Sequence, residues 1–372
     1  MDQAVYSRTL PNKYLGIKKK LQEEIASDIY DGVIPSGKYL ARKFNANIKT
    51  IDKAVKALEQ EGKLRREKGK GTFIVKDNGP APESSSKPRF IGVLSPRPAE
   101  TIEDSWLSPV LSGIQSVPDK DNINVIMKCY DFSNGLSDEK KNLKSLLDSG
   151  ISGLVAYPFI SSNGITNSSL YRKLKIPVVF FDRYLDDLNT DFAGIDHFRA
   201  GMLAAEFLIA RGHRRMAYIG SGEKVKNTED RANGFKTALS QAGIPFPKEF
   251  ELKIMDYDKD KIKSFLTHIT ASGNDSATAV CASHDGYSLA VYGAAKELGL
   301  DIPNDISLIG FGNSAAGGIL NISSIDQSLF YIGRAATKML SARLEEDRKD
   351  ERVIHQLLPV QLIARGSVKK LN

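Results

Sequence analysis

The chain has 372 residues, of which 41% are hydrophobic and 26% charged, and its formal net charge is +7. These values are ordinary for a soluble globular protein, and no apolar run approaches the roughly 18 residues that a membrane span needs. The first 76 residues hold 17 basic and 9 acidic side chains, so the positive excess lies there and the remainder carries a net charge of −1.

The first predicted element is an amphipathic helix, because four large aliphatic side chains recur at four-residue spacing. They are Ile17, Leu21, Ile25 and Ile29. A short second helix follows Pro35-Ser36-Gly37.

A third helix begins after Asn47, a good N-cap residue. Its apolar positions are spaced for one buried face, and its other face is mostly basic. The apolar face holds Ile51, Ala54, Val55 and Leu58, and the basic face holds Lys49, Thr50, Lys53 and Lys56.

The segment Lys63–Val75 predicts a basic β-hairpin with Gly69-Lys70-Gly71 at its tip. A glycine tip lets the backbone approach a phosphate or the floor of a groove closely. A solvated basic hairpin is the alternative, but three helices followed by a hairpin are typical of a winged helix-turn-helix that binds DNA.

We expect the third helix to enter the major groove of double-stranded operator DNA and the hairpin tip to reach the adjacent minor groove. The candidate DNA-binding residues are Lys38, Arg42, Asn47, Ile48, Lys49, Thr50, Lys53, Lys56, Gly69, Lys70 and Gly71. Asp52 stands on the same helix. Its carboxylate could accept from a cytosine amino group, repel a phosphate, or pair with a neighbouring lysine.

Residues 77–88 are rich in Pro, Ser and Gly and have almost no apolar content, which predicts an exposed linker. The predicted domains are a winged helix-turn-helix over 1–76 and a larger domain over 89–372.

The larger domain alternates short apolar strands with helical patterns, which is typical of an α/β fold with parallel sheets covered on both faces. The predicted strands are Phe90–Leu94, Val125–Tyr130, Leu154–Tyr157, Val178–Phe181, Met216–Ile219, Leu252–Met255, Ala277–Ala282 and Ile306–Phe311. Helical patterns include Phe198–Ala210, Arg231–Ala242, Ser288–Leu298 and Ile332–Leu344.

From Lys13 to Val75 the chain resembles the GntR-type winged helix. The motifs that carry this resemblance are Ile34-Pro35-Ser36, Leu40-Ala41, Ala54-Val55-Lys56-Ala57-Leu58, Glu61-Gly62 and Gly69-Lys70-Gly71-Thr72-Phe73.

From about 90 to 367 the chain resembles the LacI-type effector domain, which is similar to periplasmic sugar-binding proteins. The motifs include Ile176-Pro177 with Phe181-Asp182-Arg183, Arg211-Gly212-His213, Arg231 with Gly234-Phe235, Asp305–Phe311 and Ser324–Gln327. The fusion is similar to arabinose-repressor-like transcription regulators. The resemblance implies a homodimer and two lobes hinged near Asp182–Tyr184, Gly312–Asn313 and Ser324–Gln327, with one small molecule between them.

The resemblance also implies that Asp182, Arg183, Arg231 and Asp285 converge on the effector. Carboxylates and guanidinium groups suit sugar hydroxyls, and aromatic faces suit the apolar side of a sugar ring. Trp106, Phe159, Tyr257 and His284 are further candidates, although core packing would explain each of them equally well.

No catalytic constellation is present in the sequence: the five histidines lack metal-ligand spacing, and there is no nucleotide-binding or nucleophile motif. We therefore expect no enzyme activity, no metal and no cofactor. The N-terminus lacks a signal-peptide pattern, and two cysteines, Cys129 and Cys281, suit buried thiols in a reducing cytoplasm.

Together these features predict a cytoplasmic transcription regulator, a repressor of a carbohydrate-utilisation operon, whose dimer reads a pseudo-palindromic operator and responds to a monosaccharide. The alternative is a sugar-binding protein or sugar-modifying enzyme with an accessory basic domain.

Overall fold

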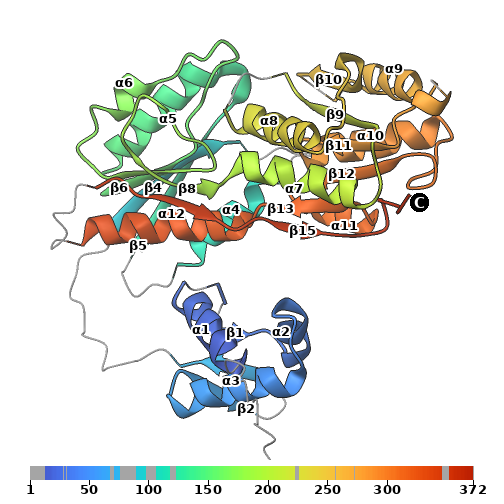
Figure 1. Ribbon diagram of the computed structural model, residues 1–372. Coiled ribbons are helices and arrows are strands. Elements are labelled where there is room, and N and C mark those ends of the chain that lie inside the picture. Colours follow the sequence, from blue (N-terminus) through green and yellow to red (C-terminus); the bar gives the residue numbers. More distant parts are fainter. Residues whose placement is uncertain are drawn as a thin grey trace, which may run out of the picture. The chain divides into compact units, whose positions relative to one another are not determined.

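The computed structural model describes residues 13–27, 29–30, 32–67, 71–75, 89–97, 106–117, 123–222, 226–255, 257–271, 273–345 and 352–371 (Figure 1). The chain forms two compact units, Met1–Ser85 and Ser86–Asn372, which we call the head and the body. The predicted hairpin tip residues Gly69 and Lys70 and the predicted linker 77–88 lie outside the described residues. No helix in the described ranges is both long and apolar enough to cross a membrane.

The head contains the three helices and the hairpin that the sequence predicts, in that order, and a short strand before the second helix that it does not predict. The elements are α1 (Lys13–Ala26), β1 (Val33–Ile34), α2 (Gly37–Lys43), α3 (Ile48–Gln60), β2 (Leu64–Glu67) and β3 (Gly71–Ile74). The strands pair antiparallel in the order β1-β3-β2. The first helix is shorter than predicted, because Ile29 lies in the turn after Ala26, from which it still packs against the core.

Capping and burial in the head follow the sequence closely. The Asn47 side chain accepts a hydrogen bond from the backbone N–H of Thr50 at 2.7 Å, which confirms it as the N-cap of α3. All four predicted apolar positions of α3 are buried against α1 and α2. The opposite face of α3 is therefore left to solvent.

The first lobe of the body is built on a parallel six-stranded sheet with the order β14-β8-β7-β6-β4-β5. Its elements are β4 (Arg89–Pro96), α4 (Leu107–Gln115), β5 (Ile123–Tyr130), α5 (Gly135–Asp148), β6 (Gly153–Ala156), α6 (Ser168–Tyr171), β7 (Val178–Phe181), β8 (Asp191–Ile195), α12 (Leu329–Leu344) and β14 (His355–Leu358), with a 3₁₀ turn at Phe132–Asn134.

The second lobe is built on a six-stranded sheet with the order β10-β9-β11-β12-β13-β15, in which only the β13–β15 pair is antiparallel. Its elements are α7 (His197–Ala210), β9 (Met216–Ser221), α8 (Lys226–Gln241), β10 (Glu251–Ile254), α9 (Lys259–Thr270), β11 (Ala279–Ala282), α10 (Asp285–Glu297), β12 (Ser307–Phe311), α11 (Ala315–Ile319), β13 (Ser323–Asp326) and β15 (Gln361–Ile363), with 3₁₀ turns at Lys248–Phe250 and Gly273–Asp275.

Helices cover both faces of the first sheet. A Cβ on Gly92 would meet Leu146 of α5, whereas a Cβ on Gly153 would meet Leu340 of α12, and these two glycines lie on opposite faces of the sheet. Such two-sided burial explains why the strands read as continuous apolar runs. The predicted α/β class with parallel sheets and two lobes is confirmed.

Four strands of the body escaped the sequence analysis, namely β8, β13, β14 and β15. They are three to five residues long, and β13 and β14 carry polar side chains among few apolar ones. A short strand without a sustained apolar run has no clear periodicity to detect.

The chain crosses between the lobes three times. The crossings lie between β8 and α7, between β13 and α12, and between β14 and β15. The expected hinge segment Ser324–Gln327 leads into the second crossing, so this expectation agrees with the structure. The expected hinges at Asp182–Tyr184 and Gly312–Asn313 are wrong, because each joins two strands of the same sheet.

Candidate functional site

The outer face of α3 presents its side chains to solvent, and the three consecutive residues 47–49 at its start are exposed. Ile48 is 52% exposed, and Asn47 and Lys49 are exposed as well. Lys38 and Arg42 are exposed on α2. Thr50 is half-buried, and its hydroxyl donates to the Asn47 side chain at 2.8 Å.

Two of the predicted lysines on α3 have partners within the head. The Lys53 ammonium lies 4.4 Å from the centre of the Tyr14 ring on α1. The Lys56 ammonium lies 3.6 Å from the Asp52 carboxylate, one helical turn away. Both lysines stay exposed. Gly71 begins β3 with φ +131°, a backbone conformation that favours glycine.

Asp52 does not stand free on α3. Its carboxylate lies 2.7 Å from the Arg66 guanidinium on β2, and the Glu59 carboxylate lies 3.8 Å from the same group. The hydrogen bond from Arg66 lowers the pKa of Asp52. Of the three roles considered for Asp52, pairing with basic neighbours is the one that the contacts support, and Arg66 is a partner that the sequence analysis missed.

In the body, Arg231 is the centre of a buried polar cluster. This α8 side chain is 6% exposed and donates three hydrogen bonds. Nε donates to Nδ1 of His197 at 3.1 Å, Nη1 donates to the carbonyl oxygen of Ser283 at 2.9 Å, and Nη2 donates to Oε1 of Gln327 at 2.8 Å. The guanidinium also lies 5.3 Å from the centre of the Phe311 ring.

Asp182 reaches the same cluster from the first lobe. It directly follows β7, is 5% exposed and has φ +59°. Its backbone carbonyl lies 3.3 Å from Nε2 of His197, and its Oδ2 accepts from the Asn227 side chain at 3.4 Å. Asp182 Oδ1 has no hydrogen-bond partner among the described residues, so it remains available to a donor from a bound molecule.

Asp285 is buried at the first residue of α10, but its partners are not those of Arg231. Its Oδ2 accepts from the backbone N–H of Ser314 at 2.5 Å, and its Oδ1 accepts from the hydroxyl of Ser324 at 3.0 Å. Burial raises its pKa. The contacts place Asp285 as an anchor for the loop after β12, and no contact is recorded between Asp285 and Arg231.

Aromatic residues line two sides of this region. The Arg183 guanidinium lies 4.3 Å from the centre of the Tyr157 ring, and Trp106 packs on Tyr157 at 5.1 Å. In the second lobe Tyr257 and His284 lie 5.8 Å apart, centre to centre. Burial and the nearby Arg231 lower the pKa of His284 to about 3, so its ring is neutral.

Phe159 belongs to a different cluster from the other aromatic candidates. Its ring packs against Tyr130 and Phe132, and its backbone N–H donates to the buried carboxylate of Glu139 at 2.8 Å. These contacts indicate core packing for Phe159, the alternative that the sequence analysis had left open.

The structure thus gathers Asp182, Arg183, Arg231 and His284 in one region. The charges of Asp182, Arg183 and Arg231 act on His197, and the charge of Arg231 acts on His284. Three members were missed: His197, next to the first crossing, Gln327, at the second, and Asn227, on α8. The sequence signal for His197 is its place two residues after the end of a buried strand, but that strand, β8, was itself missed. Gln327 lies inside a motif that the sequence analysis quoted without assigning it a contact.

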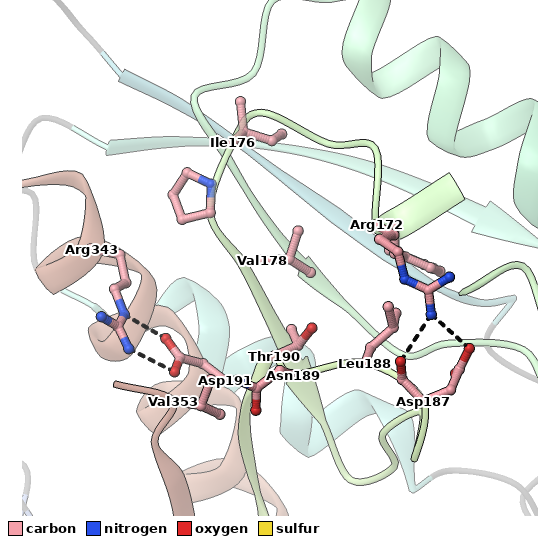
Figure 2. A pocket seen from close by; sticks show the side chains of 12 residues that line it. Arg172, Ile176, Val178, Asp187, Leu188, Asn189, Thr190, Asp191, Arg343 and Val353 are labelled. Atoms are coloured by element: carbon pink, nitrogen blue, oxygen red, sulfur yellow. Dashed lines mark hydrogen bonds and ion pairs between the residues drawn. The ribbon is translucent and has the colours of Figure 1, made fainter. Parts of the chain in front are cut away.

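A separate cavity of about 530 Å³ opens at the amino ends of β7 and β8 (Figure 2). Arg343 pairs there with Asp191 at 2.6 and 2.8 Å, and Arg172 pairs with Asp187 at 3.0 Å. Asp182 follows β7 at its carboxyl end, so the cavity lies at the opposite edge of the sheet, and no candidate effector residue lines it.

Across the described residues, no three His, Cys, Asp or Glu side chains gather where they could hold a metal ion. Cys281 is buried, as expected, whereas Cys129 is only half-buried.

Comparisons with known proteins agree with this architecture. Residues 13–74 match the gntR family of bacterial regulatory proteins, and residues 205–368 match a periplasmic binding protein-like domain. The arabinose metabolism transcriptional repressor of Geobacillus stearothermophilus is 26% identical over 377 residues, which cover 98% of this chain and 99% of that protein.

Solved structures match the body. A LacI transcriptional regulator from Bacillus cereus subsp. cytotoxis is 22% identical, with a TM-score of 0.66 over 77% of this chain and 100% of that one. A LacI family regulator from Enterococcus faecium, solved with bound ribose, is 26% identical, with a TM-score of 0.61 over 76% of this chain and 100% of that one. The protein therefore consists of a GntR-type helix-turn-helix domain followed by a periplasmic-binding-protein-like domain with the fold of LacI-family regulators.

Proposed function

We propose that this protein is a DNA-binding transcription regulator, a repressor of carbohydrate-utilisation genes, whose operator affinity is controlled by a monosaccharide bound between the lobes of the body. The observation that carries the proposal is the joining, in one chain, of an exposed basic helix-turn-helix face to a buried polar cluster at the lobe crossings. It acts in the cytoplasm, where bacterial DNA lies.

The head supports DNA binding through the exposure and charge of α2 and α3. Asn47, Ile48, Lys49 and Thr50 lead α3 into the major groove, where base edges are read. Lys38, Arg42, Lys53 and Lys56 contact phosphates, which position the head without specifying sequence. The tip at Gly69, Lys70 and Gly71 reaches the minor groove.

The body supports a sugar effector through the chemistry of its buried cluster. The Asp182 carboxylate can accept from hydroxyls, and the remaining N–H groups of Arg231 can donate to them. Trp106 and Tyr257 offer aromatic faces for the apolar side of a sugar ring. The relatives named for arabinose metabolism and the ribose-bound structure point to the same chemical class.

Two copies associate through the body, so that two heads read a pseudo-palindromic operator. The sugar can change operator affinity only by binding the DNA-competent and DNA-free states with different affinity. A coupling of ~1–3 kcal/mol is typical and corresponds to roughly 5- to 150-fold in the operator dissociation constant.

The direct test is fluorescence anisotropy with labelled DNA from upstream of the protein's own gene, in separate titrations with L-arabinose, D-ribose and buffer alone. We expect upstream DNA to bind more tightly than a shuffled duplex of equal length, and one sugar to change that affinity. Chromatography should recover the sugar unchanged. Equal affinity for both duplexes would contradict the proposal of a transcription regulator. Conversion of the sugar would favour the alternative, a sugar-modifying enzyme.

A further inference from the structure

His197 occupies a position that no sequence motif predicted. It is the first residue of α7, directly after the first crossing between the lobes, and it is 7% exposed. Its ring lies between Asp182, which belongs to the first lobe, and Arg231, which belongs to the second. No other described histidine contacts both residues.

The hydrogen bonds of this ring define its tautomer. Arginine carries five N–H donors, has no acceptor and keeps its proton in proteins. Because Nε of Arg231 donates to Nδ1 of His197 at 3.1 Å, Nδ1 must hold a lone pair. The ring hydrogen is then on Nε2, which lies 3.3 Å from the carbonyl oxygen of Asp182 and 3.7 Å from its Oδ1. A single neutral imidazole therefore accepts from one charged residue and donates to the other.

The same geometry fixes the direction of the Arg231 side chain. Its three acceptors come from three places: His197 at the first crossing, the carbonyl of Ser283 after β11, and Gln327 at the second crossing. Three of the five N–H groups are thereby committed, and the others can reach a bound molecule. Any change in how the crossings lie must alter these bonds.

We propose that His197 is the positioning residue of the effector site, holding Arg231 and Asp182 in register across the two lobes through its neutral Nε2–H tautomer. This inference rests on the proposed sugar-responsive function and adds to it a residue through which the lobes are coupled. Burial and Arg231 lower the pKa of His197 to about 4, which agrees with a neutral ring at the pH of the cell.

A conservative and a disruptive variant separate positioning from mere packing. His197→Gln keeps one acceptor and one donor at the end of the side chain, whereas His197→Phe fills a similar volume with neither. Without this acceptor Arg231 loses a bond that aims its remaining N–H groups at the sugar, and a buried hydrogen bond of this kind contributes about 1–3 kcal/mol, which is roughly 5- to 150-fold in affinity. Calorimetry with L-arabinose should therefore show near wild-type affinity for His197→Gln and a loss of that order for His197→Phe.

The matched control is His213→Gln. His213 is also a buried histidine of the second lobe, but its ring contacts Thr278 and the carbonyl of Lys369, away from the cluster. Its substitution should change the unfolding midpoint without changing the affinity for L-arabinose. Equal sugar affinity for wild type, His197→Gln and His197→Phe would overturn the proposal while leaving the sensor function intact.

A measurement without sugar keeps the proposal falsifiable if His197→Phe does not fold, or if wild type does not bind L-arabinose. In the full chain labelled with ¹⁵N-histidine, long-range ¹H–¹⁵N spectra at pH 7 should show a pyrrole-type Nε2 and a pyridine-type Nδ1 for His197, assigned by their loss in His197→Gln. An imidazolium or an Nδ1–H tautomer would overturn the positioning role whatever sugar binds. Failure of L-arabinose to bind wild type, with the expected tautomer present, counts against the arabinose effector alone.

Discussion

The Arg66 guanidinium on β2 lies 2.7 Å from the Asp52 carboxylate on α3, so the hairpin of the head is tied to the helix that carries its exposed basic face. Glu59, two turns further along α3, approaches the same guanidinium at 3.8 Å. Part of the positive charge that the sequence places on the hairpin is therefore neutralised locally and is not offered to phosphates.

From this pairing we predict that Asp52 weakens DNA binding. Asp52→Asn should free Arg66 and Lys56 from their carboxylate partner, so that binding to operator and to random duplex tightens alike. The dependence of the binding constant on salt should become steeper by about one released counterion or more. Anisotropy titrations at several salt concentrations measure both quantities. Asp260→Asn makes the same charge change on an exposed residue of α9 and should have no effect. Altered preference at one base pair, without a general gain, would instead mean that Asp52 contacts a base.

Lys49 is exposed in the first turn of α3. Lys49→Ala should weaken operator binding with little change in the salt slope, because Lys49 lies in the turn that we propose reads base edges. The comparison is Lys173→Ala, which removes an exposed lysine from the body. A salt slope lower by about one would instead place Lys49 against a phosphate of the DNA backbone.

The contact between α7 and α8 depends on glycine. A Cβ on Gly234 would lie 1.9 Å from the carbonyl oxygen of Phe198, and one on Gly201 would lie 2.1 Å from that of Arg231. Gly234→Ala must push the helices apart, so the free energy of unfolding should fall by at least about 1–3 kcal/mol in urea. Gly293→Ala, in α10 with open space around it, should be neutral or stabilise by about 0.5–1 kcal/mol. Equal stability of the two variants would disprove this close packing.

Stability should fall in mild acid because of His197. Its pKa lies at about 4 in the folded protein, against an ordinary value of 6.5, since burial, Arg231 and Arg183 oppose its charge more than Asp182 favours it. The unfolded chain binds this proton more tightly than the folded protein does. The neutral ring's contribution to the free energy of unfolding is therefore fully present above pH 6.5 and declines as the pH falls toward 4. Between pH 7 and about pH 5 the free energy of unfolding should fall by about 2 kcal/mol from this source. Urea unfolding of His197→Gln at both pH values should show a correspondingly smaller decline, and an identical decline would contradict this origin.

The first effect that we expect from a substitution of Asp285 is on the stability of the folded body. Its two carboxylate oxygens accept from Ser314 and Ser324 in a buried site, and an amide would turn a donor toward one of these donors. Asp285→Asn should therefore lower the free energy of unfolding by about 1–3 kcal/mol. Asp275→Asn is the exposed comparison. If Asp285→Asn unfolds like wild type but loses affinity for L-arabinose, Asp285 contacts the sugar directly.

The sequence by itself determined the elements whose signal is local. Asn47 caps α3 because a short polar side chain can bond the N–H groups of the next turn, and that preference is visible in a few residues. The parallel strands of the body appear as apolar runs because both faces are buried, which is also a local property. The basic excess of the first 76 residues needed no structure at all.

Only the tertiary structure decided which side chains meet. Arg231 and Asp285 were expected to converge on one effector, but each bonds other side chains and not the other. Their partners lie at the ends of several strands that are distant in the sequence. His197 and Gln327 are separated by 130 residues, yet they bond the same guanidinium at two lobe crossings. The sequence left three roles open for Asp52, and only the fold of the hairpin brings Arg66 to it. Such pairings are set by long-range closure of the chain, and no local pattern of residues encodes them.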